Sequence, residues 1–190
     1  LLQVLGSEAP GLTLIVLPVQ FRSVGELLAK GDLDLAVTVA DELPKNVRRR
    51  RLFTGGFVCL FDPRHAKVAT TKKKLSLATY LAHDHVVVSY NGDTRGVVED
   101  VTGIRRRVRV SVNNFHVVGA VVEGGPLLAT VPRVVADDVL RLHPKLQTTA
   151  LPFTLSGAYV ELLWNAVADD DEAAAYVRDH VAAIAADVGR

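Results

Sequence analysis

The chain has 190 residues, of which 49% are hydrophobic, and its 22 basic and 21 acidic residues leave a net charge of +1. This composition excludes a disordered chain, and the near-neutral charge excludes the broad basic field that draws a protein onto nucleic acid. No apolar run approaches the roughly 20 uninterrupted residues of a membrane-spanning helix, so we expect no membrane partner.

Cysteine usage and the first residues bear on the compartment. Cys59 is the only cysteine, so no internal disulfide can form, which is typical of the reducing cytoplasm. The sequence begins Leu1-Leu2-Gln3-Val4, without an initiator methionine or a charged leader segment. We therefore expect a piece of a longer, cytoplasmic protein.

The first part of the chain predicts a helix, a strand, a second helix and a second strand. Residues 1–5 form an apolar helical turn that Pro10-Gly11 ends, and residues 12–17 are rich in strand formers. An amphipathic helix at 24–30 is preceded by Ser23 and ended by Gly31, and a strand follows at 32–39. This order predicts two parallel strands joined by a right-handed crossover, with further extended segments at 51–53 and 57–61.

The rest of the chain repeats the alternation. Strands are expected at 85–89, 107–112 and 127–131, and helices at 76–82, 94–102, 115–123 and 134–142. After a return crossing at 147–153 come a strand at 158–164 and a helix from about 171, whose positive amino end suits the acidic residues 169–172. We predict an α/β protein with two lobes, residues 1–64 with 152–190 and residues 65–151, each a mostly parallel sheet flanked by helices.

Three segments together resemble the effector-binding domain of LysR-type transcription regulators: Glu8-Ala9-Pro10-Gly11-Leu12, Gly31-Asp32-Leu33-Asp34-Leu35-Ala36-Val37 and Leu127-Leu128-Ala129-Thr130-Val131-Pro132-Arg133. Gly96-Val97-Val98-Glu99 and Gly103-Ile104-Arg105-Arg106 are similar to the branch that senses nodulation signals, salicylate or nitroaromatics. The resemblance spans nearly the whole chain.

This resemblance implies a periplasmic-binding-protein-like fold of type 2, with a small, aromatic or acidic effector bound in the cleft between the lobes. It implies a homodimer or homotetramer whose geometry changes on binding, and DNA contact only through an N-terminal helix-turn-helix domain that this sequence lacks. The apolar helix at 115–123 needs a cover, which either its own sheet or a partner subunit would supply.

Candidate ligand-binding residues follow from a general rule and from the resemblance. Ligands of open α/β sheets bind beyond the carboxyl ends of the strands, where helix amino ends present free N–H groups. The candidates are Phe21, Arg22, Ser23, Ala40, Ser89, Tyr90, Asn91, Thr94, Arg95, Asn114, Phe115, Thr130, Pro132, Phe153 and Thr154.

Two interpretations stay open for the most polar candidates. Arg95 and nearby turn amides could hold a carboxylate, with Phe21 and Phe115 as apolar walls, or the turn is an ordinary helix cap with a solvated arginine. Asn114 could be a pocket residue, or an N-cap followed by a core aromatic.

The sequence gives little support for a catalytic or a metal-binding function. The sequence has no nucleophile elbow and no glycine motif for nucleotides, so we expect neither an enzyme nor a cofactor. We interpret His83 and His85 as surface histidines, Cys59 as an inert core thiol, and the basic runs 48–51 and 105–107 as solvated edges. The alternative function is a solute-binding protein of a transport system with the same fold, which an upstream signal peptide would favour.

Overall fold

The computed structural model describes residues 1–19, 22–40, 42–68, 75–90, 92–155, 157 and 159–188. They form two compact units, here called unit 1 (Leu1–Thr54 with Ala158–Arg190) and unit 2 (Gly55–Gly157). The predicted lobe boundaries at 64/65 and 151/152 fall inside unit 2, because a strand at residues 57–61 pairs with later strands of that unit.

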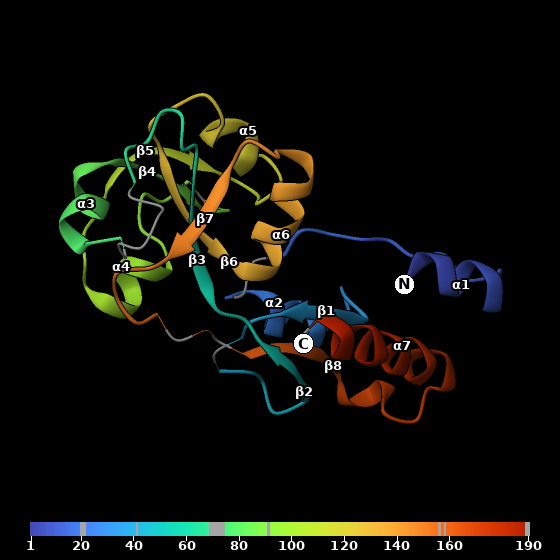
Figure 1. Ribbon diagram of the computed structural model, residues 1–190. Coiled ribbons are helices and arrows are strands. Elements are labelled where there is room, and N and C mark those ends of the chain that lie inside the picture. Colours follow the sequence, from blue (N-terminus) through green and yellow to red (C-terminus); the bar gives the residue numbers. More distant parts are fainter. Residues whose placement is uncertain are drawn as a thin grey trace. The chain divides into compact units, whose positions relative to one another are not determined.

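Unit 1 is built around an antiparallel sheet. Its elements are α1 (Leu2–Glu8), α2 (Val24–Lys30), β1 (Leu35–Thr38), β2 (Val47–Thr54), β8 (Tyr159–Asn165), the short 3-10 helix η1 (Ala166–Ala168) and α7 (Glu172–Val188) (Figure 1). The returning strand β8 lies in the centre and pairs antiparallel with both β1 and β2. Helix α2 ends at Gly31, whose φ of 79° suits a residue without a side chain, and it buries Val24 and Leu28 against the sheet.

The prediction of a parallel strand pair in the first part of the chain is wrong. Residues 12–17 belong to no helix or strand, and Ile15 and Val16 are 76% and 80% exposed. A strand forms only where a neighbour satisfies its backbone N–H and C=O groups, and β1 has β8 as its sheet partner instead. Strand propensity alone therefore predicted a strand that does not form here.

Unit 2 is a mixed five-stranded sheet with helices on both faces. Its elements are β3 (Phe57–Phe61), α3 (Leu77–Ala82), β4 (Asp84–Val88), α4 (Val97–Thr102), β5 (Arg107–Val112), α5 (Val118–Val122), β6 (Leu128–Pro132), α6 (Arg133–Leu142) and β7 (Gln147–Ala150) (Figure 1). The strand order is β5-β4-β6-β3-β7. β4 is parallel to β5 and β6, as the alternation predicted, but β3 is antiparallel to β6 and β7. The predicted "mostly parallel" sheets are therefore corrected to one antiparallel and one mixed sheet.

Side-chain alternation along β3 divides unit 2 into two cores. Leu60 faces the core under α5 and α6, whereas Cys59 and Phe61 face the core that contains Tyr80 of α3. Val118 and Val122 of α5 are fully buried in the first core, so the unit's own sheet covers this apolar helix. In the described part of the chain, no helix is both long and apolar enough to cross a bilayer.

Candidate ligand-binding site

The strands of unit 2 bring many of the predicted ligand-binding residues to one edge of the sheet. Because β4 runs parallel to β5 and β6, the carboxyl ends of all three strands lie at the same edge. The antiparallel β3 begins there, with Phe57 opposite Pro132, and β7 ends there, with Ala150 opposite Val58. The predicted residues at or next to this edge are Ser89, Tyr90, Asn114, Phe115, Thr130, Pro132, Phe153 and Thr154.

The turn after β4 is tied to the end of β5 by hydrogen bonds. The Asp93 amide donates to Ser89 Oγ at 3.0 Å, and Ser111 Oγ donates to the Asp93 carbonyl at 2.9 Å. Arg95 leaves 69% of its side chain exposed and donates to Asp100 of α4 at 3.1 Å. A ligand carboxylate would replace this exposed ion pair at little cost, since such pairs contribute about 0–1 kcal/mol. Two further predicted residues here are exposed, Tyr90 and Thr94.

In the segment after β5, the side chains make hydrogen bonds and apolar contacts within unit 2. Asn114 Oδ1 accepts hydrogen bonds from the amides of His116 and Val117, at 3.0 and 3.3 Å, and its Nδ2 donates to Asn113. Phe115 packs on the core under α5 and α6. Phe115 is thus the core aromatic of the alternative interpretation, whereas Asn114 bonds the turn before α5 and is not its N-cap, which is Val117. A ligand would have to share the Asn114 side-chain amide.

At β6 the hydroxyl of Thr130 meets a residue that the sequence reasoning missed. Tyr80 of α3 is fully buried, and its hydroxyl oxygen lies 2.7 Å from Thr130 Oγ1. Its ring contacts Phe153 edge-to-face, with ring centroids 5.3 Å apart. Burial raises the pKa of Tyr80 and keeps the phenol protonated. Tyr80 therefore joins two predicted ligand-binding residues, Thr130 and Phe153.

A buried ion pair between Glu99 of α4 and Arg106 lies near Tyr80. Arg106 Nε and Nη2 donate to the two carboxylate oxygens at 2.7 and 2.6 Å, and the Arg106 side chain is only 2% exposed. The Gly96 amide donates to Glu99 as well, at 3.0 Å. Burial by itself would raise the pKa of Glu99, but the hydrogen bonds and charge of Arg106, together with the Gly96 amide, lower it to about 2.

The interpretation of Arg106 as part of a solvated edge is therefore wrong, whereas its neighbour Arg107 is exposed. A sequence signal for this pair was present. Glu99 stands three residues after the helix-starting Gly96, the position from which a glutamate reaches back to a helix amino end. Nothing in the run Arg105-Arg106-Arg107 distinguishes its middle member, since only the packing of α4 decides which arginine is enclosed.

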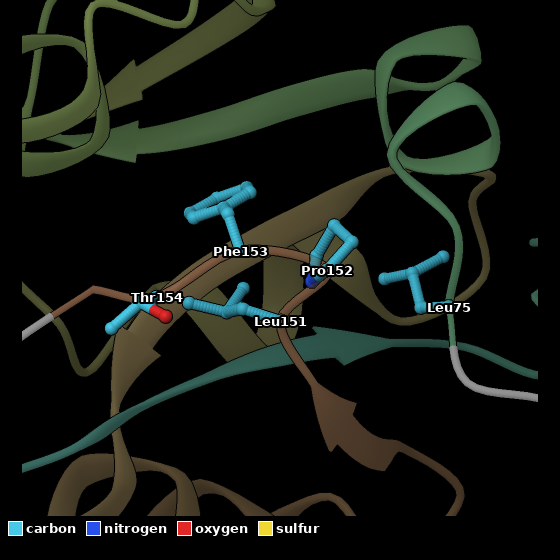
Figure 2. Close-up of a pocket in the computed structure, with 5 residues that line it drawn as sticks. All are labelled: Leu75, Leu151, Pro152, Phe153 and Thr154. Carbon is cyan, nitrogen blue, oxygen red and sulfur yellow. The ribbon is translucent and has the colours of Figure 1, made fainter.

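An open hollow of about 320 Å³ lies beside the segment that follows β7. Figure 2 shows Leu151, Pro152, Phe153 and Thr154 along this segment, with Leu75 on the chain that leads into α3. Four of its five lining residues carry apolar side chains, but polar atoms are exposed in it as well.

The candidates of unit 1 are less informative. The Ala40 carbonyl accepts a hydrogen bond from Arg49 at 3.1 Å, and Ser23 begins α2 without a side-chain cap bond to it. Arg22 is exposed. Phe21 of this unit, and Asn91 of unit 2, lie outside the described residues.

His85 and Cys59 are both buried in unit 2. His85 is fully buried and not on the surface as predicted, because β4 is an inner strand, and its Nε2 hydrogen-bonds the Tyr80 carbonyl at 2.8 Å. Burial lowers the pKa of His85 to about 4 and raises the pKa of Cys59 to about 12. Cys59 is therefore a core thiol, as predicted, and its burial disfavours the reactive thiolate. Among the described residues, no group of acidic, histidine or cysteine side chains could hold a metal ion.

Polar and aromatic side chains gathered at the carboxyl edge of an α/β sheet, beside an open hollow, are typical of domains that bind small molecules. The sequence pattern of the LysR substrate binding domain matches residues 1–186, and the chain belongs to this family. It is the effector-binding regulatory domain of a LysR-type transcription regulator, and not an enzyme.

Curated relatives and solved structures agree with this assignment. The chain is 30% identical over 181 residues to the HTH-type transcriptional activator NahR of Pseudomonas putida, covering 94% of this chain and 59% of the relative. It is 30% identical over 177 residues to nodulation protein D 1 of Sinorhizobium fredii, covering 90% and 53%. The regulatory domain of MexT, a transcriptional activator in Pseudomonas aeruginosa, superimposes with a TM-score of 0.81 at 28% identity, covering 96% of this chain and 88% of that one. The chain thus spans little more than half the length of these curated relatives.

Proposed function

We propose that this domain senses a small aromatic or acidic molecule, which binds at the carboxyl edge of the unit 2 strands. The observation that carries the proposal is that four separate segments place Ser89, Asn114, Thr130 and Phe153 along this edge, where Phe153 also lines an open hollow. Sheet edges of this kind present strand-end side chains and helix amino ends to a ligand. The family assignment favours a regulator over the alternative of a transport protein.

A thermal-shift screen of benzoate, salicylate and their neutral isosteres tests the ligand class. At a free concentration of about 100 times its dissociation constant, a ligand adds about 2.7 kcal/mol of stability, which corresponds to roughly 5–10 °C for a protein of this size. If Arg95 anchors a carboxylate, Arg95→Ala removes most of the acid's shift. Asp100→Asn then increases the shift, because it releases Arg95 from its ion pair.

The screen has clear contrary outcomes. Binding of the neutral isosteres alone, or an acid shift that survives Arg95→Ala, would show that Arg95 is only a solvated turn residue. A screen in which no aromatic compound stabilises the chain would remove the aromatic class altogether.

How effector binding is passed on to transcription is inferred from the family, and not from a surface of this chain. We propose a cytoplasmic homodimer or homotetramer whose geometry responds to the effector and moves DNA-binding domains outside this sequence. Sedimentation at tens of micromolar should then show more than a monomer. The 190-residue chain alone should give no footprint on an operator in moderate salt, since its net charge is only +1.

A further inference from the structure

Three polar side chains join the short helix α1 to the long helix α7 within unit 1. Glu8 is the last residue of α1, and Tyr176 and His180 lie about one turn apart on α7, with ring centroids 4.3 Å from each other. The Tyr176 hydroxyl donates a hydrogen bond to Glu8 Oε2 at 2.7 Å, and His180 Nε2 lies 3.4 Å from the same oxygen. A single carboxylate oxygen of α1 therefore contacts both side chains of α7.

Helix α1 depends on contacts of this kind. It has only seven residues, and a helix of that length is unstable in water by itself. All seven residues are described, and Leu5 is the one that is buried. A change in the contact with Glu8 should therefore change the fraction of molecules in which α1 is folded.

The hydrogen bonds of His180 determine which of its ring nitrogens carries a proton. Nδ1 lies 2.9 Å from the Tyr176 carbonyl, which can only accept, so Nδ1 must be the donor. A neutral imidazole has one N–H, and its Nε2 is then an acceptor. In the neutral state the Nε2 lone pair therefore faces the Glu8 carboxylate, and no hydrogen bond forms between them. A second proton turns Nε2 into a charged donor and makes this contact an ion pair.

The other charged groups near His180 have partners of their own. On α7, Arg178 donates to backbone carbonyls at the end of η1, and Asp179 pairs with Arg50 of β2. Among the described acidic residues, only Glu8 pairs with His180. Protonation of the ring therefore acts mainly on the contact between α7 and α1.

We propose that Glu8 and His180 form a pH-sensitive latch, which holds α1 on α7 more firmly when His180 is protonated. Tyr176 supplies the constant part of the latch, because its hydrogen bond to Glu8 raises the pKa of the phenol, which stays protonated and keeps donating. The His180 and Glu8 side chains are 25% and 55% exposed, so their ion pair should change the docking equilibrium of α1 by about two- to fivefold. The latch uses none of the residues proposed to bind the effector.

Amide exchange with water, measured by NMR on the 190-residue chain, tests the latch. The Leu5 and Ala9 amides donate to carbonyls of the same segment, so their protection factors, corrected for the intrinsic effect of pH on exchange, report the folding of α1. These factors should be about two- to fivefold higher at pH 5.5 than at pH 8, an interval that spans the usual titration of histidine and leaves carboxylates ionised. The Gly31 amide at the end of α2 is the reference for unit 1 as a whole and should not show this change.

Four variants assign the effect to the latch. His180→Gln should abolish the difference between the two pH values, because glutamine stays neutral. Glu8→Gln should do the same, while it keeps an oxygen that accepts from Tyr176. Tyr176→Phe should lower the protection of α1 at both pH values and keep the difference. His116→Gln, at an exposed histidine of unit 2, is the control and should change nothing.

The contrary results are equally definite. Equal protection of α1 at the two pH values, or higher protection at pH 8, would overturn the latch. A pH difference that survives either His180→Gln or Glu8→Gln would overturn it as well, since the titrating group or its partner would then lie elsewhere.

Discussion

Helix α4 carries two neighbouring acidic residues, each paired with an arginine, that differ in burial. Glu99 and Arg106 are 6% and 2% exposed in their side chains, whereas Asp100 and Arg95 are 45% and 69% exposed. Removing one partner of a buried pair costs about 3–5 kcal/mol, because the other charge stays enclosed and unpaired, while an exposed pair contributes about 0–1 kcal/mol. Glu99→Gln should therefore destabilise unit 2 far more than Asp100→Asn.

The pH dependence gives a second measure of the same pair. The pKa of Glu99 is lowered from 4.5 to about 2, a difference that corresponds to about 3 kcal/mol. A lowered carboxyl pKa stabilises the folded state fully above the unfolded value, and this contribution is lost as the pH falls from about 4.5 toward 2. In Glu99→Gln this acid-sensitive contribution should be absent.

Urea denaturation followed by far-UV circular dichroism is the suitable assay, because this signal includes the helices and strands of unit 2, whereas the only tryptophan, Trp164, belongs to unit 1. The double variant Glu99→Gln/Arg106→Met should recover part of the loss, because it removes the unpaired charge. Free energies of unfolding for Glu99→Gln and Asp100→Asn that agree within about 1 kcal/mol would refute the assignment of a buried, enclosed charge.

Three further predictions concern other buried groups. The pKa of His85 is lowered from 6.5 to about 4, so the unfolded chain takes up the proton first and the free energy of unfolding falls by about 3 kcal/mol as the pH drops from 6.5 to 4. His85→Asn should flatten the urea-derived stability over that interval, and an equal slope in both proteins would count against burial of the ring. Cys59 should not react with a thiol reagent at pH 8 until urea unfolds the chain, and rapid reaction in the native state would contradict its enclosure. Gly119→Ala should cost about 1–3 kcal/mol, because its Cβ would overlap the His143 ring. Gly6→Ala, with open space at its Cβ, is the control and should cost nothing.

Local patterns in the sequence were sufficient for most elements and for part of the site. The amphipathic stretch between Ser23 and Gly31 predicts α2, and the alternation of strands and helices from residue 84 to 142 predicts the parallel strands β4, β5 and β6. Because such strands end at one edge, their ordering already places Ser89, Asn114 and Thr130 near each other. These inferences need only short-range periodicity and the handedness of crossovers.

Tertiary structure decided the features that depend on a distant partner. Residues 12–17 have the composition of a strand, yet sheet membership depends on a neighbour, and β8, more than a hundred residues later, is the strand that pairs with β1. Likewise, only the packing of α3 and α4 determines that Arg106 is buried against Glu99 and that Tyr80 reaches Thr130. The sequence by itself determined the type and order of most elements, because these follow from local periodicity. Strand pairing, burial and hydrogen-bond partners required the fold, because they depend on contacts between residues far apart in the chain.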